Sequence, residues 1–255
     1  MEIAERTGEE PIDGIVERSG VPAKVEPAEV NYDADAEQRF KFQTERSGRM
    51  YTVVHVFGPI LDEQVLEYER ARNQRLGEAE YSEADDDDAT AITSTGFNAA
   101  INFWNKSGAS AEGYAGKVSD RDKAFAVGLL FGTEFESLHL ASEEDLCPET
   151  GDDQSTLVMR CLFDGQEVYT NAVLKTATPN QIEQFENLQS RTLLVKGTKF
   201  GQRDQRIPAK AKRLAEMFDQ MVVSTDGYAG RVPLHHKAAF ALRHLRSEQK
   251  AITGN

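Results

Sequence analysis

Hydrophobic residues recur at positions i, i+3, i+4 and i+7 in two distant segments of the chain, which is the spacing of a helix buried along one side. The two quartets are Phe97, Ala100, Ile101 and Trp104, and Ala211, Leu214, Ala215 and Phe218. A nearly identical heptapeptide follows each quartet, Glu-Gly-Tyr-Ala-Gly-Lys-Val at 112–118 and Asp-Gly-Tyr-Ala-Gly-Arg-Val at 226–232. Because the quartets and heptapeptides align without a gap, we expect the two segments to fold alike.

Strand patterns precede both helical patterns. β-Branched and aromatic residues are frequent in the stretches 39–44, 50–57, 156–162 and 167–174. A short polar turn with a glycine joins the stretches in pairs, which predicts two β-hairpins. Helices are expected to begin near Asp62 and at Thr178, where Thr178 is an N-cap and Pro179 takes the first helical position. A further helix should follow each heptapeptide, and Ser119 with Asp122 resembles a capping box at the first of them.

Together these elements predict an α+β fold made by tandem duplication of a small unit, a β-hairpin followed by about three helices, after an extended N-terminal arm. The expected order is an acidic arm at 1–38, a first α+β repeat at 39–132, an acidic linker at 133–155, a second α+β repeat at 156–247 and a C-terminal tail at 248–255. One continuous domain with a coincidental Gly-Tyr-Ala-Gly pair is the alternative. Pseudo-twofold and head-to-tail packing of the repeats both remain open.

The charge balance limits the classes of partner. The 255 residues carry a formal net charge of -14, and an acidic surface repels phosphates, so direct nucleic-acid binding is not expected. No stretch approaches the roughly 18 apolar residues of a membrane span, so no membrane contact is expected. The first residues lack the basic and apolar regions of a secretory signal, and the two cysteines form no CxxC pair. We therefore expect synthesis in the cytoplasm.

Three segments are candidates for contacts with other protein subunits. In the arm, Ile12, Ile15 and Val16 form a small apolar cluster that could anchor on a neighbour. The loops between the first and second helices of the two units carry opposite charge, which favours head-to-tail association, although drift in exposed loops would give the same contrast. The acidic loop contributes Asp85, Asp86, Asp87 and Asp88, and the basic loop contributes Lys196, Lys199, Arg203 and Arg206.

Residues with catalytic or metal-binding chemistry form no motif, so no catalytic residue, cofactor or metal is predicted. The four aspartates lack the ligand spacing of an EF-hand and indicate a solvated loop. His235, His236 and His244 have no complete set of zinc ligands around them and are expected to be polar surface residues. Cys147 and Cys161 are expected to be free, partly buried thiols. Gly-Tyr-Ala-Gly predicts a tight turn between helices, with glycines at positive φ and the tyrosine packed beneath it.

Three functions remain open. The first is a non-enzymatic structural or assembly protein acting through protein–protein contacts, as a homo-oligomer or a component of a larger assembly such as a viral (phage) particle. The second is an intracellular acidic adaptor or inhibitor that binds a basic partner. The third is an enzyme with a site between the two repeats, because catalytic groups are recognised by geometry and not by spacing. The repeats, the arm and the lack of a catalytic motif favour the first function.

Overall fold

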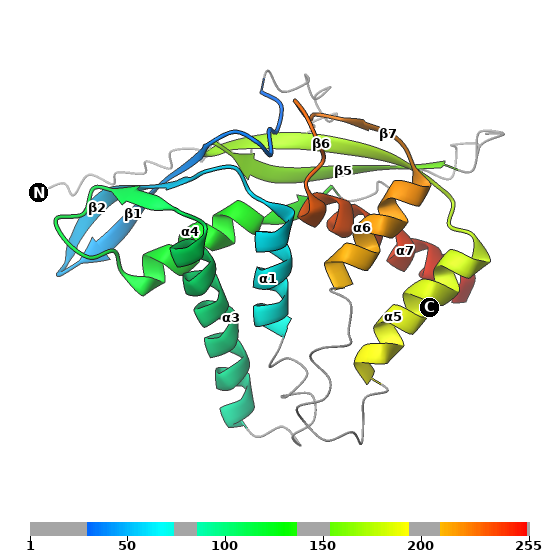
Figure 1. The fold of residues 1–255 in the computed structure, drawn as a ribbon, viewed down its shortest axis with the longest axis horizontal. Helices are drawn as coiled ribbons and strands as arrows, with labels where there is room; N and C mark the ends of the chain where they lie inside the picture. The colour runs from blue at the N-terminus through cyan, green and yellow to red at the C-terminus, as the bar shows by residue number, and fades with distance from the viewer. Residues whose placement is uncertain (1–29, 74–85, 137–153, 194–209, 254–255) are drawn as a thin grey trace, which may run out of the picture.

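A computed structural model describes residues 30–73, 86–136, 154–193 and 210–253. These residues contain six helices and two antiparallel sheets, so the chain has the expected mixed α+β fold. In Figure 1 the sheets lie along the top of the molecule and the helices pack beneath them. The helices therefore cover one side of the strand layer, and the buried faces of the strands point towards them.

The first sheet and its helices come from residues 38–131. The strands have the order β1-β2-β3, and β1 pairs with β2 along its whole length. Two helices lie side by side below this sheet, and a third packs against β1 (Figure 1). The elements are β1 (Gln38–Arg46), β2 (Arg49–Phe57), α1 (Asp62–Asn73), α3 (Asp86–Lys106), β3 (Ser110–Glu112) and α4 (Asp120–Phe131).

The second sheet has the strand order β4-β5-β6-β7. Its edge strand β4 directly follows α4 in the sequence and pairs antiparallel with β5. From β5 onwards the order strand, strand, helix, helix, strand, helix is the same as in residues 38–131. The elements are β4 (Thr133–Phe135), β5 (Gln154–Phe163), β6 (Gln166–Lys175), α5 (Pro179–Leu193), α6 (Lys210–Met221), β7 (Val222–Asp226) and α7 (Leu234–Thr253).

Both predicted hairpins are present, and their turns have the same backbone conformation. Ser47 and Gly48 have φ values of 52° and 71°, and Asp164 and Gly165 have values of 49° and 74°. Positive φ at both central residues is the geometry of a two-residue type I′ turn, whose twist matches that of the flanking strands. An aspartate or serine followed by glycine is suited to this conformation, so the turn residues fix the register of each hairpin.

The predicted helix starts are also confirmed. The Thr178 hydroxyl accepts a hydrogen bond from the Gln181 N–H at 3.4 Å, and the Gln181 side chain accepts one in return from the Thr178 N–H at 2.8 Å. The Ser119 hydroxyl accepts a hydrogen bond from the Asp122 N–H at 3.1 Å and caps α4. These bonds satisfy backbone donors that a helix leaves unpaired at its first turn.

The acidic loop predicted at 78–88 ends earlier than expected. Asp86, Asp87 and Asp88 belong to the first turn of α3. The helix dipole favours acidic residues at a helix N-terminus, which explains why this run starts a helix. Asp85, the remainder of that loop and the basic loop at 196–206 lie outside the described residues, as do Ile12, Ile15 and Val16.

One hydrophobic core extends across the helices of both sheets. Its completely buried aromatic residues include Phe57, Phe185, Phe218 and Phe240. The second predicted quartet, on α6, is buried as expected. The halves of the chain therefore share this apolar interior, although each has its own sheet.

The first predicted quartet is only partly correct. Phe97 is 40% exposed, and Trp104 is partly buried at the edge of the core. Phe103 occupies the core position instead, with its ring 5.5 Å from that of Tyr68 on α1. The buried face of α3 is therefore rotated from the predicted one, because α3 packs against α1 and α4 together.

Polar contacts also tie the two halves together. Arg231 donates hydrogen bonds to Asp35 at 2.9 Å and to Asp62 at 3.0 Å. The carboxylate of Glu69, on α1, accepts a hydrogen bond at 3.0 Å from the N–H of Ala211 at the start of α6. A side chain from the first half thus caps a helix of the second half.

Residues just before β1 pack on the second half. The backbone N–H of Tyr32 donates to Gly227 at 2.8 Å, and the Ala229 N–H donates to the Tyr32 carbonyl at 3.0 Å. The Tyr32 side chain is 1% exposed, and its ring lies 5.3 Å from Phe163. This segment therefore covers the turn end of the β5–β6 hairpin.

Candidate functional site

A buried polar cluster joins the first hairpin to α3 and α4. Its members come from β1, β2, the end of α3, the Gly-Tyr-Ala-Gly turn and the start of α4: Thr44, Arg46, His55, Trp104, Tyr114, Ser119 and Asp122. These residues are distant in sequence, and the α4 N-cap brings the last of them against the hairpin. Such a concentration of titratable groups is the strongest candidate for a site in the described part of the chain.

The hydrogen bonds of this cluster run in one direction. The Trp104 indole N–H donates to Nδ1 of His55 at 3.0 Å. Nδ1 is therefore the acceptor, and Nε2 carries the ring hydrogen and donates to the Tyr114 hydroxyl at 2.9 Å. The Tyr114 hydroxyl in turn donates to Asp122 at 2.9 Å. Each hydrogen-bonding group in this series, from the Trp104 indole to the Asp122 carboxylate, therefore has a partner.

Asp122 receives further bonds from the hairpin. The Thr44 hydroxyl donates to its Oδ1 at 2.9 Å, and Arg46 contacts its Oδ2 at 2.5 Å. Burial raises the pKa of Asp122, but the hydrogen bonds from Ser119, Thr44 and Tyr114 and the charge of Arg46 outweigh it, so the pKa lies below its ordinary value. The carboxylate is therefore charged at neutral pH.

His55 and Tyr114 are held in their neutral forms. Burial lowers the pKa of His55 to about 4, against the smaller opposing effect of the Asp122 charge. Burial and the hydrogen bond to Asp122 raise the pKa of the Tyr114 hydroxyl. A general base must have a free acceptor near the reacting proton, whereas both His55 nitrogens are occupied by neighbouring side chains. The arrangement thus fixes the turn and α4 against the hairpin.

A smaller polar cluster occupies the same place beside the second hairpin. The Tyr228 hydroxyl donates to the Thr170 hydroxyl at 3.1 Å and lies 3.0 Å from Nδ1 of His236. His236 is 0% exposed, and the Tyr32 ring lies 4.5 Å from its imidazole. Tyr228 occupies the same position in the second heptapeptide as Tyr114 does in the first, and His236 follows Tyr228 at the same distance as Asp122 follows Tyr114.

The prediction of surface histidines was wrong. His236 and His244 are buried, and His244 lies 2.9 Å from the carbonyl of Lys175. Both ring nitrogens of His235 and Nε2 of His236 are buried without a hydrogen-bond partner among the described residues. Burial lowers the pKa of His235 to about 3 and that of His236 well below its ordinary value. The sequence pattern missed this because α7 is buried along much of its length.

The Gly-Tyr-Ala-Gly turn differs from its prediction in two respects, because it does not join two helices and its second glycine, Gly116 or Gly230, does not have positive φ. A short strand precedes it in both halves, β3 before Gly113 and β7 before Gly227, so it joins a strand to a helix. The first glycine of each turn has positive φ, 87° for Gly113 and 81° for Gly227. A Cβ on Gly113 would lie 2.6 Å from the Thr52 carbonyl, and one on Gly227 would lie 2.4 Å from the Tyr169 carbonyl. Glycine is required there because the turn touches the backbone of the second strand.

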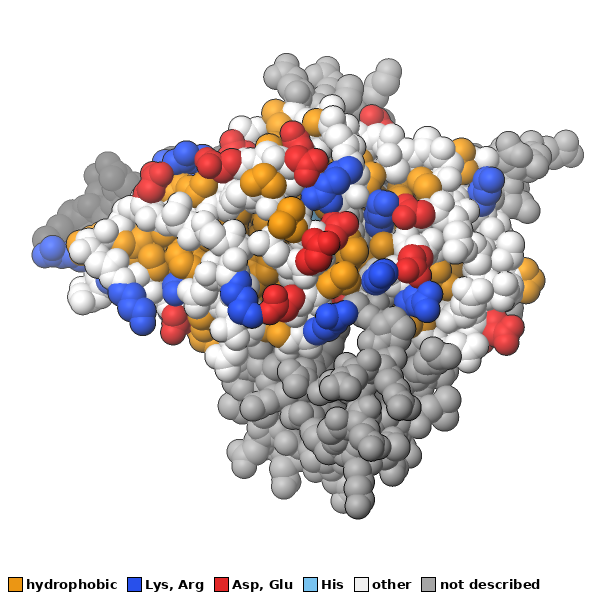
Figure 2. Space-filling view, in the orientation of Figure 1, with side chains coloured by type: hydrophobic (Ala, Val, Ile, Leu, Met, Phe, Trp, Pro, Cys, Tyr) orange, Lys and Arg blue, Asp and Glu red, His pale blue; other side chains and the backbone are white. Residues whose placement is uncertain are grey.

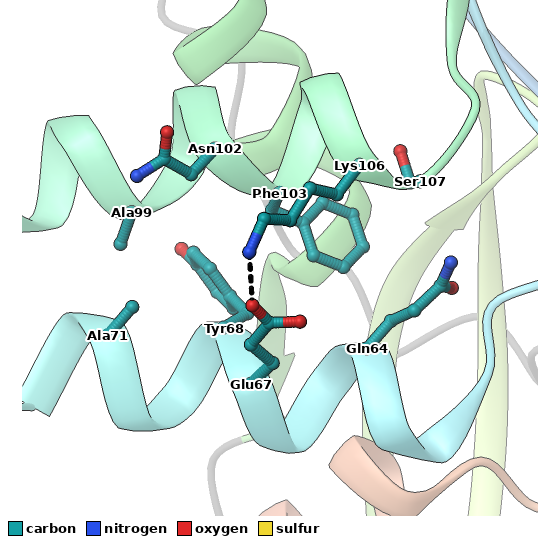
Figure 3. Close-up of a pocket in the computed structure, with 9 residues that line it drawn as sticks. All are labelled: Gln64, Glu67, Tyr68, Ala71, Ala99, Asn102, Phe103, Lys106 and Ser107. Carbon is teal, nitrogen blue, oxygen red and sulfur yellow. Dashed lines mark hydrogen bonds and ion pairs between the residues drawn. The ribbon is translucent and has the colours of Figure 1, made fainter.

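Figure 3 shows a small pocket between α1 and α3. Lys106 reaches across its opening to an ion pair with Glu67, and the rings of Tyr68 and Phe103 lie within it. Its volume is about 70 Å³, compared with roughly 300 Å³ or more for a typical small-molecule site. The pocket can hold a few water molecules but is too small for an ordinary substrate.

Exposed apolar side chains gather at the turn end of the first hairpin. Tyr51 is 44% and Phe125 52% exposed, and the Phe125 ring lies 4.8 Å from Phe42, which shares the helix-covered face of the sheet with Tyr51. Met50, 60% exposed, pairs with Glu45 and lies on the opposite face. We call Phe42, Tyr51 and Phe125 the hairpin patch. Elsewhere on the face in Figure 2, acidic and basic side chains are interspersed with hydrophobic ones. The hairpin patch is therefore a candidate contact surface.

Cys161 is a free, buried thiol, and burial raises its pKa to about 12, so it is inert at neutral pH. Cys147 lies outside the described residues. Within residues 30–73, 86–136, 154–193 and 210–253, no three His, Cys, Asp or Glu side chains converge on a metal position. None of the described helices combines the length and apolar composition needed to cross a bilayer.

Comparisons of the chain with protein-family models, with curated proteins and with solved structures gave no match.

Proposed function

We propose that this chain is a non-enzymatic structural or assembly protein that acts through contacts with other protein subunits. The hairpin patch is the observation that carries the proposal. Tyr51 and Phe125 expose apolar surface beside a sheet edge, where a partner subunit would cover it.

A contrast between the two hairpins supports this proposal. Val168 follows its hairpin turn at the same distance as Tyr51 follows the first turn, but Val168 is 1% exposed. Tyr32 and Ala34, which precede β1, cover the second site. Among the described residues nothing covers the first site in this way. The equivalent surface is thus covered by the chain itself at the second hairpin and exposed at the first. This contrast is what we expect if another chain covers the first surface.

The rival function, an enzyme with a site between the repeats, has less support. The titratable cluster around Asp122 lies against the first hairpin, and its donors and acceptors are paired with one another. The pocket between α1 and α3 also belongs to one half of the chain. An adaptor that binds a basic partner is consistent with the net charge of -14, but no particular group of described residues supports that function.

We also propose that the chain arose by tandem duplication of one unit. The support is the repeated element order, the matching φ values in the two hairpin turns, and the matching approach of Gly113 and Gly227 to a neighbouring strand. Duplicated units with different exposed surfaces are suited to a symmetric assembly, such as an accessory part of a viral particle.

The proposal is tested by sedimentation velocity of the full chain from about 1 to about 100 µM, a range in which moderate interfaces associate. We expect larger species as concentration rises. The double variant Tyr51→Asp, Phe125→Asp should abolish them while retaining the native circular dichroism spectrum.

A matched control is the double variant Leu61→Asp, Val223→Asp, because Leu61 is 52% and Val223 47% exposed at other places in the fold. It should associate like the original protein. If the original chain stays monomeric throughout, or if both double variants behave alike, the hairpin patch is not an assembly surface.

A further inference from the structure

The outer edge of β1 is unpaired in the described part of the chain. β1 has β2 on one side, and no described strand pairs with its other side. The second sheet differs, since β4 covers the corresponding edge of β5. Exposed strand edges carry backbone donors and acceptors that readily pair with another strand.

The direction of the free backbone groups follows from one contact. The Arg39 N–H donates to the Asp164 side chain at 3.0 Å, so it points away from β2. Alternate residues of a strand point the same way, so the outward groups are those of Lys41, Gln43 and Glu45. The second hairpin turn packs against Arg39, and a Cβ on Gly165 would lie 3.3 Å from the Arg39 carbonyl. The open part of the edge is thus the stretch from Lys41 to Glu45.

The charges along this stretch are self-complementary. Lys41 and Glu45 lie two residues on either side of Gln43, and their side chains share the exposed face of the sheet. In an antiparallel pairing of two such edges centred on Gln43, each Lys41 faces the Glu45 of the other copy. A shift of register would separate these charges or place like charges together.

We propose that two copies of this chain associate by antiparallel pairing of their β1 edges, centred on Gln43, and so join their first sheets across a twofold axis. The proposal rests on the proposed assembly function and names its partner as a second copy of the chain. A twofold contact of this kind uses the same surface on both copies and closes as a dimer. Lysine at a strand edge usually discourages pairing, but here it is matched by Glu45 of the partner copy.

The hairpin patch fits the same arrangement. Phe42 neighbours Gln43 at the centre of the pairing, and Phe125 packs against Phe42 from α4. The twofold axis therefore brings the Phe125 side chains of both copies close together below the joined sheet. Burial of these aromatic rings supplies apolar contact area that backbone pairing alone lacks.

A charge-reversal cycle tests the register. Lys41→Glu places two acidic residues opposite each other at both ends of the pairing, and Glu45→Lys places two basic residues there. Each single variant should weaken the dimer roughly tenfold or more, measured as Kd by sedimentation velocity at low salt. The double variant Lys41→Glu, Glu45→Lys restores opposite charges and should dimerise like the original chain.

Neither Lys41 nor Glu45 makes an ion pair with another described residue, so the variants should fold normally, as checked by urea unfolding. Failure of the double variant to recover dimerisation overturns the proposal. If Tyr51→Asp, Phe125→Asp abolishes association while all three charge variants associate normally, the β1 pairing is wrong and the assembly function stands. If the original chain does not associate, both proposals fail.

Discussion

Three side chains converge on the carboxylate of Asp122, from Thr44, Arg46 and Tyr114. Its side chain is 4% exposed, so loss of its charge would leave these donors with a weaker acceptor in a buried place. Asp122→Asn keeps the shape but removes the charge. We expect it to lower the free energy of unfolding by about 2 kcal/mol, since Arg46 is partly solvated and recovers some hydration.

Urea unfolding at pH 7 measures this effect. Asp120→Asn is the matched control, because Asp120 lies on the same helix turn with its side chain 55% exposed, and its substitution should change stability by less than about 0.5 kcal/mol. The pKa of Asp122 is lowered, so its stabilisation is complete at pH 7 and is lost as pH falls through that lowered pKa. The difference in the free energy of unfolding between the original chain and Asp122→Asn should therefore become smaller at acidic pH. A constant difference would contradict the charged network.

The buried histidines predict a second acid-sensitive step at higher pH. Burial lowers the pKa of His55 to about 4 and of His235 to about 3, while an unfolded histidine titrates near its ordinary value of 6.5. Below pH 6.5 the unfolded chain binds protons that the folded chain does not, so stability falls as pH drops from 6.5 towards 4. Each histidine contributes a slope of about 1.4 kcal/mol per pH unit in this window.

His55→Gln should flatten this slope while lowering stability at pH 7, because glutamine does not titrate. The measurement is the urea unfolding midpoint at intervals between pH 8 and pH 4, with the flat region above pH 7 as the internal reference. Equal slopes for His55→Gln and the original chain would mean that His55 is protonated in the folded state.

For individual residues, the sequence predicted that Ser119 caps a helix, but it did not predict that Asp122 accepts hydrogen bonds from the hairpin. Thr44 and Asp122 are 78 residues apart, and no motif contains both. Only the packing of α4 against β1 brings them together. The same limit applies to the histidines, since local spacing on α7 does not reveal how many of its faces are covered.

Among the elements, the Gly-Tyr-Ala-Gly turn has the strictest residue requirement, because its first position accepts only glycine without strain. Gly113→Ala and Gly227→Ala each put a methyl group against a backbone carbonyl at positive φ. We expect each substitution to cost about 1–3 kcal/mol, because the strand and the turn must separate or strain. Thermal unfolding of each variant measures the loss.

The second glycines of the same turns are the controls. A Cβ on Gly116 or Gly230 would have no atom within 4 Å. Gly116→Ala and Gly230→Ala should therefore change stability by less than about 0.5 kcal/mol. If the two glycines of either turn prove equally sensitive, the close approach to β2 or β6 is not what requires glycine.

The longer elements were predictable and the shorter ones were not. Alternating residues and glycine turns located β1, β2, β5 and β6, and capping residues located the starts of α4 and α5. The strands β3 and β4 have three residues each, too few for alternation to show, and their pairing is set by β2 and β5. For α3, Ala100 fits both the predicted and the observed buried stripe, so spacing alone could not decide which face meets α1.

For the whole molecule, the shared core gives a prediction about cooperativity. Buried residues of both halves form one cluster, β4 extends from the first half into the second sheet, and Arg231 bonds to Asp35 and Asp62 across the halves. The halves should therefore unfold together, with the calorimetric and van't Hoff enthalpies equal.

Two core substitutions distinguish cooperative unfolding of the halves from independent unfolding. Phe57→Ala, on β2, and Phe185→Ala, on α5, each remove a ring that is 0% exposed and should cost about 3–5 kcal/mol. Each should lower the Tm of the entire transition. If the halves unfold separately, Phe57→Ala would split the transition and leave one component at the original Tm. That result would show that the core contacts between the halves are too weak to couple them.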